Sequence, residues 1–136
     1  MPTCMASIFK RIIDREIPAH IVAETPEYLA FLDISPLKKG HTLVIPKQEV
    51  DYIFDLDEVT YTGLMRFAKQ VAGALKSAIP CNRIGVAVVG LEVPHAHVHL
   101  VPLEEINDLN FGNPRVNMEA DELKAVAQSI RSEFEQ

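Results

Sequence analysis

The sequence predicts an α+β fold, an antiparallel sheet of five strands with a long helix on one face and a second helix at the end of the chain. Three observations predict it. Five short apolar runs have the length of strands, a long amphipathic segment follows the third run, and another amphipathic segment closes the sequence. With 136 residues, the chain is long enough for one domain with a hydrophobic core and too short for two ordinary domains.

The first part of the chain is expected to form a short helix and three strands. Apolar residues at positions 8, 9, 12 and 13 have helical spacing, Ser7 is a suitable N-cap, and Pro18 cannot continue a helix. The strands are expected at His20–Glu24, Tyr28–Ile34 and His41–Ile45. Thr25-Pro26-Glu27 favours a hairpin between the first two, and 35–40 reads as a loop.

The long amphipathic segment predicts a helix from about Asp57 to Ile79. Asp57 is a plausible N-cap, and Pro80 stops the helix. One apolar stripe at spacings of three and four contains Leu64, Phe67, Val71, Leu75 and Ile79. A single helical turn is expected just before it, at Val50–Phe54.

The last part of the chain is expected to contain the two remaining strands and the closing helix. Arg83–Val89 is apolar on both sides, which predicts a central strand, and Gly90–Val93 links it tightly to the fifth strand. Residues 107–116 read as a loop. The closing helix, Glu119–Phe134, places on one face Leu123, Val126, Ala127, Ile130 and Phe134.

Composition and charge exclude several classes of function. The formal charge of −6, from 13 basic and 19 acidic residues, argues against a broad nucleic-acid-binding face. No apolar stretch approaches the ~18 residues of a membrane span, and no signal-like segment is evident. Cys4 is expected to be a free thiol, and it forms neither a C-x-x-C pair nor a disulfide framework with Cys81. We therefore expect a cytoplasmic protein that does not bind membranes.

Three histidines alternate along the fifth strand, between Pro94 and Pro102. Side chains of a strand alternate between its faces, so His95, His97 and His99 are expected on one face of the sheet. Ala96, Val98 and Leu100 are then expected on the other face, and the two prolines at the strand ends. Neutral imidazole is a nucleophile, a general base and a metal ligand near pH 7. This row is where chemistry is expected, either catalysis or, as a weaker alternative, zinc binding.

The histidine strand resembles the signature of the histidine triad (HIT) superfamily of nucleotide hydrolases and transferases. Further blocks follow the HIT pattern in order and spacing, namely Ile8-Phe9 with Ile12-Ile13, Glu16-Ile17-Pro18, Ala30–Pro36 and Gly40–Lys47. The resemblance covers roughly residues 7 to 103, which leaves 104–136 as a C-terminal extension of a single HIT-like domain. It implies a homodimer in which two sheets join into one, and no cofactor.

The resemblance also implies a reaction. The middle histidine, His97, attacks the α-phosphorus of a purine nucleotide conjugate, and water resolves the nucleotidyl-histidine. His99 helps to position the phosphoryl oxygens or the leaving group, His95 orients the site, and His41 closes the network from the adjacent strand. The nucleoside is expected against Ile8, Phe9, Ile12, Phe31, Leu32 and Ile34, with Asp33 accepting from the ribose hydroxyl groups. These apolar residues are equally compatible with plain core positions.

Two departures from the HIT pattern lie just before the histidines. Leu91 occupies the place of a glutamine that contacts the leaving-group oxygen, and Glu92 the place of a small hydroxyl residue. The alternative function is therefore a nucleotide-binding HIT fold with little or no turnover. Ser7 and Lys10 occupy the positions of a C-x-x-C zinc motif found in many bacterial-type relatives, so that metal site is expected to be absent.

Overall fold

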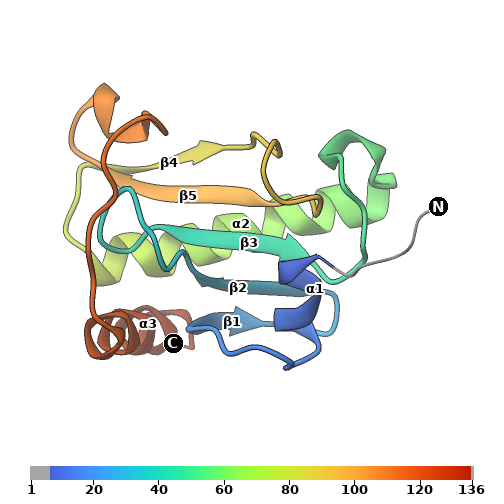
Figure 1. The fold of residues 1–136 in the computed structure, drawn as a ribbon, viewed down its shortest axis with the longest axis horizontal. Coiled ribbons are helices and arrows are strands. Elements are labelled where there is room, and N and C mark those ends of the chain that lie inside the picture. Colours follow the sequence, from blue (N-terminus) through green and yellow to red (C-terminus); the bar gives the residue numbers. More distant parts are fainter. Residues whose placement is uncertain (1–6, 136) are drawn as a thin grey trace.

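A computed structural model, which describes residues 7–135, contains one five-stranded sheet with three helices packed on it (Figure 1). The strands are β1 (Ile21–Glu24), β2 (Tyr28–Leu32), β3 (Thr42–Pro46), β4 (Arg83–Ala87) and β5 (Val98–Leu103). The helices are α1 (Ile8–Ile13), α2 (Glu58–Ala78) and α3 (Ala120–Phe134), with short 3-10 turns at Ile53–Asp55 and Ile106–Leu109. The sheet order is β1-β2-β3-β5-β4, and every neighbouring pair is antiparallel, which confirms the predicted fold class.

Helix starts fall where the capping residues predict them. The Ser7 hydroxyl accepts a hydrogen bond from the Lys10 amide at the start of α1. The Asp57 carboxylate accepts from the Thr60 amide at 2.7 Å at the start of α2. Each cap satisfies an amide that has no partner within its helix.

Helices α2 and α3 lie on the same face of the sheet and share one hydrophobic cluster (Figure 1). All five residues of the predicted α2 stripe are buried there. The cluster also takes Leu123, Val126, Ala127 and Ile130 from α3, and a side-chain donor of Arg131 reaches the Ile21 carbonyl of β1. The closing helix therefore packs beside α2 as part of the main core.

The opposite face of the sheet carries α1 and a smaller cluster. It consists of Phe9, Ile12, Leu29, Phe31, Leu43 and Ile45. Strand alternation sorts the residues: Leu43 belongs to this face, whereas Val44 belongs to the face that α2 covers. Because α1 is short, it leaves the part of this face over β3 and β5 open, and the histidines lie there.

The position of β4 corrects the prediction of a central strand. Within residues 7–135, β4 pairs only with β5 and forms the edge of the sheet, and it ends at Ala87, before Val88. Val86 is 51% exposed and Val88 42%. An apolar run does not by itself distinguish a strand with two neighbours from a strand at the edge of the sheet.

β5 begins later than predicted, at Val98, because the β3–β5 ladder ends there. Val44 lies opposite Val98, and the same register would bring Pro46, which has no amide hydrogen, opposite Ala96. The Ala96 amide donates to the Val50 carbonyl instead. At the other end, Pro102 lies inside β5 rather than at its terminus, beyond the last residue of β3 that pairs with β5.

No helix within residues 7–135 is both long enough and apolar enough to cross a membrane. Cys4, which was expected to be a free thiol, lies outside the described residues, and Cys81 is a free thiol.

Candidate active site

Strand alternation places the histidines on the face that α1 leaves open. Ala96, Val98 and Leu100 are all buried in the cluster under α2, as predicted, so the alternate residues His97 and His99 face the opposite side. The alternation continues through residues 95–97, although these precede the ladder of β5.

Backbone carbonyls fix the tautomers of the first two histidines. Nδ1 of His97 lies 2.7 Å from the His95 carbonyl oxygen. Since a carbonyl only accepts, Nδ1 of His97 carries a hydrogen and donates it, so the lone pair of the neutral ring is on Nε2. Nε2 of His95 likewise donates to the Pro46 carbonyl at 2.8 Å, while its Nδ1 lies 3.4 Å from the Ser7 hydroxyl. His95 is fully buried and holds the segment in place, whereas His97 presents a nucleophilic nitrogen.

A second chain of hydrogen bonds fixes the other two histidines. The Leu37 amide donates to Nδ1 of His41 at 3.0 Å, so the hydrogen of neutral His41 is on Nε2. That Nε2 lies 3.0 Å from Nδ1 of His99 and donates to it, which leaves the hydrogen of His99 on Nε2. His99 can therefore donate a hydrogen bond next to His97, whose ring centroid is 4.9 Å away.

Burial keeps both of these rings neutral. It lowers the pKa of His41 to about 4 and the pKa of His99 to about 3, because a buried imidazolium loses its hydration. Neighbouring positive groups, including Arg115, lower both pKa values further. Burial also lowers the pKa of His95. At neutral pH the network therefore holds uncharged rings with defined donors.

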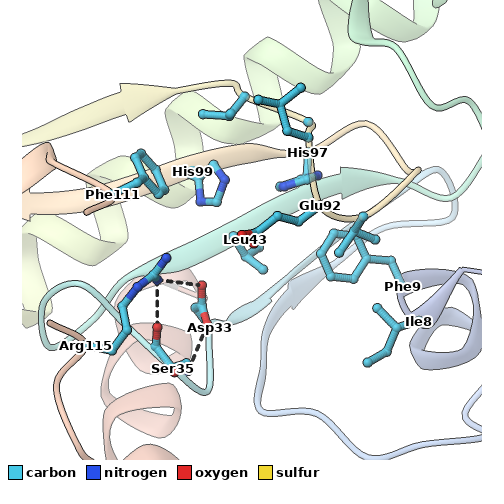
Figure 2. Close-up of a pocket in the computed structure, with 14 residues that line it drawn as sticks. Ile8, Phe9, Asp33, Ser35, Leu43, Glu92, His97, His99, Phe111 and Arg115 are labelled. Atoms are coloured by element: carbon cyan, nitrogen blue, oxygen red, sulfur yellow. Dashed lines mark hydrogen bonds and ion pairs between the residues drawn. The ribbon is translucent and has the colours of Figure 1, made fainter. Parts of the chain in front are cut away.

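His97 and His99 open into a cavity of about 510 Å³ on this face (Figure 2). The cavity is lined by Ile8, Phe9, Asp33, Ser35, Leu43, Val89, Gly90, Leu91, Glu92, Val93, His97, His99, Phe111 and Arg115. Its floor is the sheet, its sides are α1 and the loop between β4 and β5, and the remaining wall comes from residues 111–115. A cavity of this size and mixed polarity suits a small-molecule ligand.

Of the seven residues expected to contact the nucleoside, three line the cavity, two lie buried behind it, and two lie elsewhere. Ile8, Phe9 and Asp33 line the cavity. Ile12 and Phe31 are buried behind it, and the Phe9 ring packs edge-on at 5.4 Å from the Phe31 ring, so they support the cavity wall. The remaining two residues are Leu32 and Ile34.

Leu32 and Ile34 do not line the cavity. Leu32 follows Phe31 in β2, so its side chain points to the opposite face and is buried under α2. The expected contact of Leu32 with a nucleoside is therefore corrected: it is a core residue. Ile34 is 70% exposed, in the turn after β2.

Phe111 and Arg115 line the cavity although no sequence pattern indicated them. The Phe111 ring lies edge-on to His99, with centroids 4.7 Å apart, and Arg115 lies over the Phe111 ring. Arg115 also donates to the Ser35 carbonyl at 2.8 Å and comes within 3.9 Å of the Asp33 carboxylate (Figure 2). Both residues lie in the irregular segment after β5, whose path no local pattern predicts.

Asp33 joins these residues to the histidine network. Burial raises its pKa, while a hydrogen bond from the Ser35 amide at 2.8 Å and the charge of Arg115 favour the carboxylate. One Asp33 oxygen lies 3.8 Å from Nε2 of His41. Oxygen acceptors therefore remain available at the edge of the cavity.

One group of residues has the spacing of a metal site, but its hydrogen bonds argue against one. Ligand atoms of Asp33, His41 and His99 lie within 4.8 Å of one another. A metal would have to replace the hydrogen on Nε2 of His41, yet that hydrogen is required while Nδ1 accepts from the Leu37 amide. The hydrogen bonds from Leu37 to His41 and from His41 to His99 are each satisfied when no metal is bound.

Comparison with models of protein families shows which family this chain belongs to. The model of the HIT domain matches residues 14–106, about two thirds of the chain. The chain belongs to the HIT family. The match ends before Phe111, so the HIT region holds the histidine network, and one wall of the cavity comes from outside it.

Known HIT relatives resemble this protein over nearly their full length. An adenosine 5'-monophosphoramidase of Schizosaccharomyces pombe is 33% identical, with 96% of this chain and 99% of the relative covered. A crystal structure of a HIT-like protein from Bartonella henselae has a TM-score of 0.81 at 30% identity, covering 93% of this chain and 95% of that chain. A zinc-bound histidine triad protein from Mycobacterium smegmatis has a TM-score of 0.80 at 25% identity, covering 94% and 92%.

Proposed function

We propose that this HIT protein is a nucleotide hydrolase or transferase that cleaves a purine nucleotide conjugate at its α-phosphate. Candidate conjugates are phosphoramidates, mixed anhydrides and dinucleoside polyphosphates. One observation carries the proposal: the hydrogen bond from Nδ1 of His97 to the His95 carbonyl places the lone pair of the neutral ring on Nε2, at the floor of the cavity. The name of the S. pombe relative, an adenosine 5'-monophosphoramidase, supports the same chemistry.

The reaction is a double displacement at phosphorus. Nε2 of His97 donates its lone pair to the α-phosphorus and forms a P–N bond, and the bond from phosphorus to the leaving group breaks with its electron pair on the leaving atom. An amine leaving group takes up a proton from solvent. Water then attacks the phosphorus, the bond to His97 breaks with its pair on Nε2, and the nucleoside monophosphate and one proton are released.

The other histidines prepare His97 and its surroundings. His95 fixes the tautomer of His97 through its carbonyl group. His99 offers its Nε2 hydrogen to a phosphoryl oxygen, because His41 donates to its Nδ1. A donor that is already oriented before the reaction stabilises charge that develops on the phosphoryl group.

The nucleoside is proposed to bind between α1 and Asp33. Ile8 and Phe9 offer apolar surface, and Ile8 is 51% exposed, so it is available to a base. Asp33 accepts from the ribose hydroxyl groups. No cofactor is needed for this chemistry.

Two features of the loop favour the alternative, a HIT fold that binds nucleotides with little turnover. Leu91 is 87% exposed and has no donor for a leaving-group oxygen. Glu92 lines the cavity and repels a phosphate. Both features slow the departure of a phosphate more than the departure of an amine.

We also propose that the protein is a cytoplasmic homodimer that pairs through β4. Within residues 7–135, the outer edge of β4 pairs with no other strand, and the valines there and just beyond it are about half exposed. Pairing with a second copy would complete the backbone hydrogen bonds of this edge and cover those valines.

The direct test is hydrolysis of AMP phosphoramidates by the wild type and by His97→Gln, together with calorimetry using AMP. Turnover by the wild type and its loss in His97→Gln, with AMP binding kept, supports the enzyme. AMP binding without turnover in both proteins supports the binding alternative. Neither binding nor turnover contradicts both functions.

A further inference from the structure

The loop between β4 and β5 brings a carboxylate into the cavity. Glu92 lines it together with His97 and His99, and Figure 2 shows its side chain reaching across Leu43. The loop turns at Gly90, whose φ of 76° is a conformation that other residues rarely adopt. The backbone thus holds Glu92 over the floor of the cavity.

The negative charge of Glu92 is not balanced within the part of the chain that the structure describes. The charged residues that line the cavity are Asp33, Glu92 and Arg115. Arg115 is engaged at the other end, with the Ser35 carbonyl at 2.8 Å and Asp33 at 3.9 Å. Among residues 7–135, no side chain forms an ion pair or a hydrogen bond with the Glu92 carboxylate, so its charge is available to a ligand.

The geometry of displacement determines which part of a ligand faces this charge. In a displacement at phosphorus, the attacking and leaving atoms lie roughly in line on opposite sides. The attacking His97 is on the sheet side of the cavity, so the leaving group departs away from the sheet. Glu92 overhangs the sheet from the loop (Figure 2), so it lies on the side toward which the leaving group would depart.

We propose that Glu92 selects conjugates by the charge of their leaving group, so that nucleotides joined to a cationic amine are the preferred substrates. The inference rests on the proposed function and specifies its substrate class. When the P–N bond breaks with its electron pair on nitrogen, the departing amine takes one proton from water to become neutral. A second proton from water then makes it an ammonium group, which a carboxylate stabilises. A phosphate or carboxylate departs with added negative charge, which Glu92 repels.

The test uses three phosphoramidates that share AMP and the P–N bond. Their leaving amines are 3-(trimethylammonio)propylamine, which carries an added positive charge, propylamine, and 3-aminopropanesulfonate, which carries an added negative charge. The kcat/KM values are compared between the wild type, Glu92→Gln and Glu92→Lys. Glu58→Gln is the matched control, because it removes the same charge from α2, on the other side of the sheet. Intrinsic leaving-group reactivity cancels when the same substrates are compared between variants.

In the wild type and in Glu58→Gln, the cationic substrate should have the highest kcat/KM. Glu92→Gln should lower the ratio of cationic to anionic kcat/KM about tenfold, the size expected for one charge pair in a partly solvated site, and Glu92→Lys should reverse it. Added salt should reduce the wild-type ratio.

The proposal is overturned if the wild type cleaves all three substrates and the ratio stays within twofold in Glu92→Gln. Loss of all activity in Glu92→Gln, with an unchanged melting temperature, also overturns it, since Glu92 would then serve the chemical step itself. A wild type that cleaves none of the three contradicts the proposed function as well, so the two failures are distinguishable.

Discussion

At the residue scale, the site depends on hydrogen bonds that begin at the backbone. The His95 carbonyl and the Leu37 amide each determine which nitrogen of a neighbouring ring carries hydrogen. From these two contacts, His97 receives a free Nε2 and His99 a donor beside it. The proposed catalytic roles therefore depend on rings that these hydrogen bonds orient before any ligand binds.

This neutrality predicts how stability depends on pH. The unfolded chain protonates histidine near pH 6.5, whereas burial lowers the pKa of His41 to about 4 and of His99 to about 3. The stability that these two neutral rings contribute is fully present above about pH 6.5 and is lost as the pH falls toward their pKa values in the folded protein. Chemical unfolding from pH 7.5 to 4.5 should show almost no pH dependence from these histidines above about pH 6.5, and below about pH 6 a slope that approaches about 1.4 kcal/mol per pH unit for each of them. His41→Gln should reduce this slope, and an equal slope in both proteins contradicts the account.

Asp33 gives a prediction for nucleotide recognition. If it accepts from ribose hydroxyl groups, Asp33→Asn should raise KM for an AMP phosphoramidate about tenfold or more, since hydrogen bonds to charged groups contribute about 1.5–3 kcal/mol. The 2',3'-dideoxy analogue, which has no hydroxyl groups for Asp33 to bind, is the matched control substrate. Steady-state kinetics should show little effect of the variant on it. An equal loss on both substrates would show that Asp33 acts elsewhere.

The sequence predicted the histidine row because a period of two determines the shared face whenever a strand is buried on its other side. It could not predict Arg115 and Phe111. Their place beside His99 depends on the path of an irregular segment after β5, which no spacing encodes. Leu32 was assigned to the cavity by resemblance alone, although its neighbour Phe31 faces the other way.

At the element scale, α3 is an integral part of the core. Its apolar side chains lie in the same cluster as those of α2, although the family match ends at residue 106. Periodicity and caps predicted both helices, because apolar spacing and N-cap chemistry are local. Their common face could not be predicted, since it depends on how the chain returns to β1.

Ile130 tests the contribution of α3. It is fully buried, and Ile130→Ala should lower the free energy of unfolding by about 2–5 kcal/mol through lost burial and the cavity left behind. The exposed Gln128, on the same helix, supplies the control Gln128→Ala, which should change stability by less than about 0.5 kcal/mol. Urea unfolding followed by circular dichroism measures both. If the two variants unfold alike, α3 is not part of the cooperative unit.

At the scale of the whole molecule, the proposed dimer depends on the outer edge of β4, which pairs with no other strand within residues 7–135. The sequence predicted a central strand because Arg83–Val89 is apolar on both sides, and residues 7–135 supply β4 with only one neighbour. That pattern is consistent with a strand that becomes internal when two sheets join.

Val86→Lys tests this assembly. Val86 is 51% exposed on β4, and a lysine there should disfavour pairing because its charge would be desolvated against a second copy. Val59→Lys, at a position of α2 that is 81% exposed, is the control for an added lysine. Sedimentation velocity should find the wild type and Val59→Lys dimeric and Val86→Lys shifted toward monomer. A monomeric wild type contradicts the dimer.

The central claim is that the free Nε2 of His97 becomes bonded to phosphorus during turnover. Rapid acid-free quenching with an AMP phosphoramidate, followed by peptide mass spectrometry, measures this directly. The account predicts an adenylyl adduct on the peptide that contains His97, assigned to that residue by fragmentation, which forms and decays within one turnover. Turnover with the adduct on another residue, or with no adduct at any time, would contradict it.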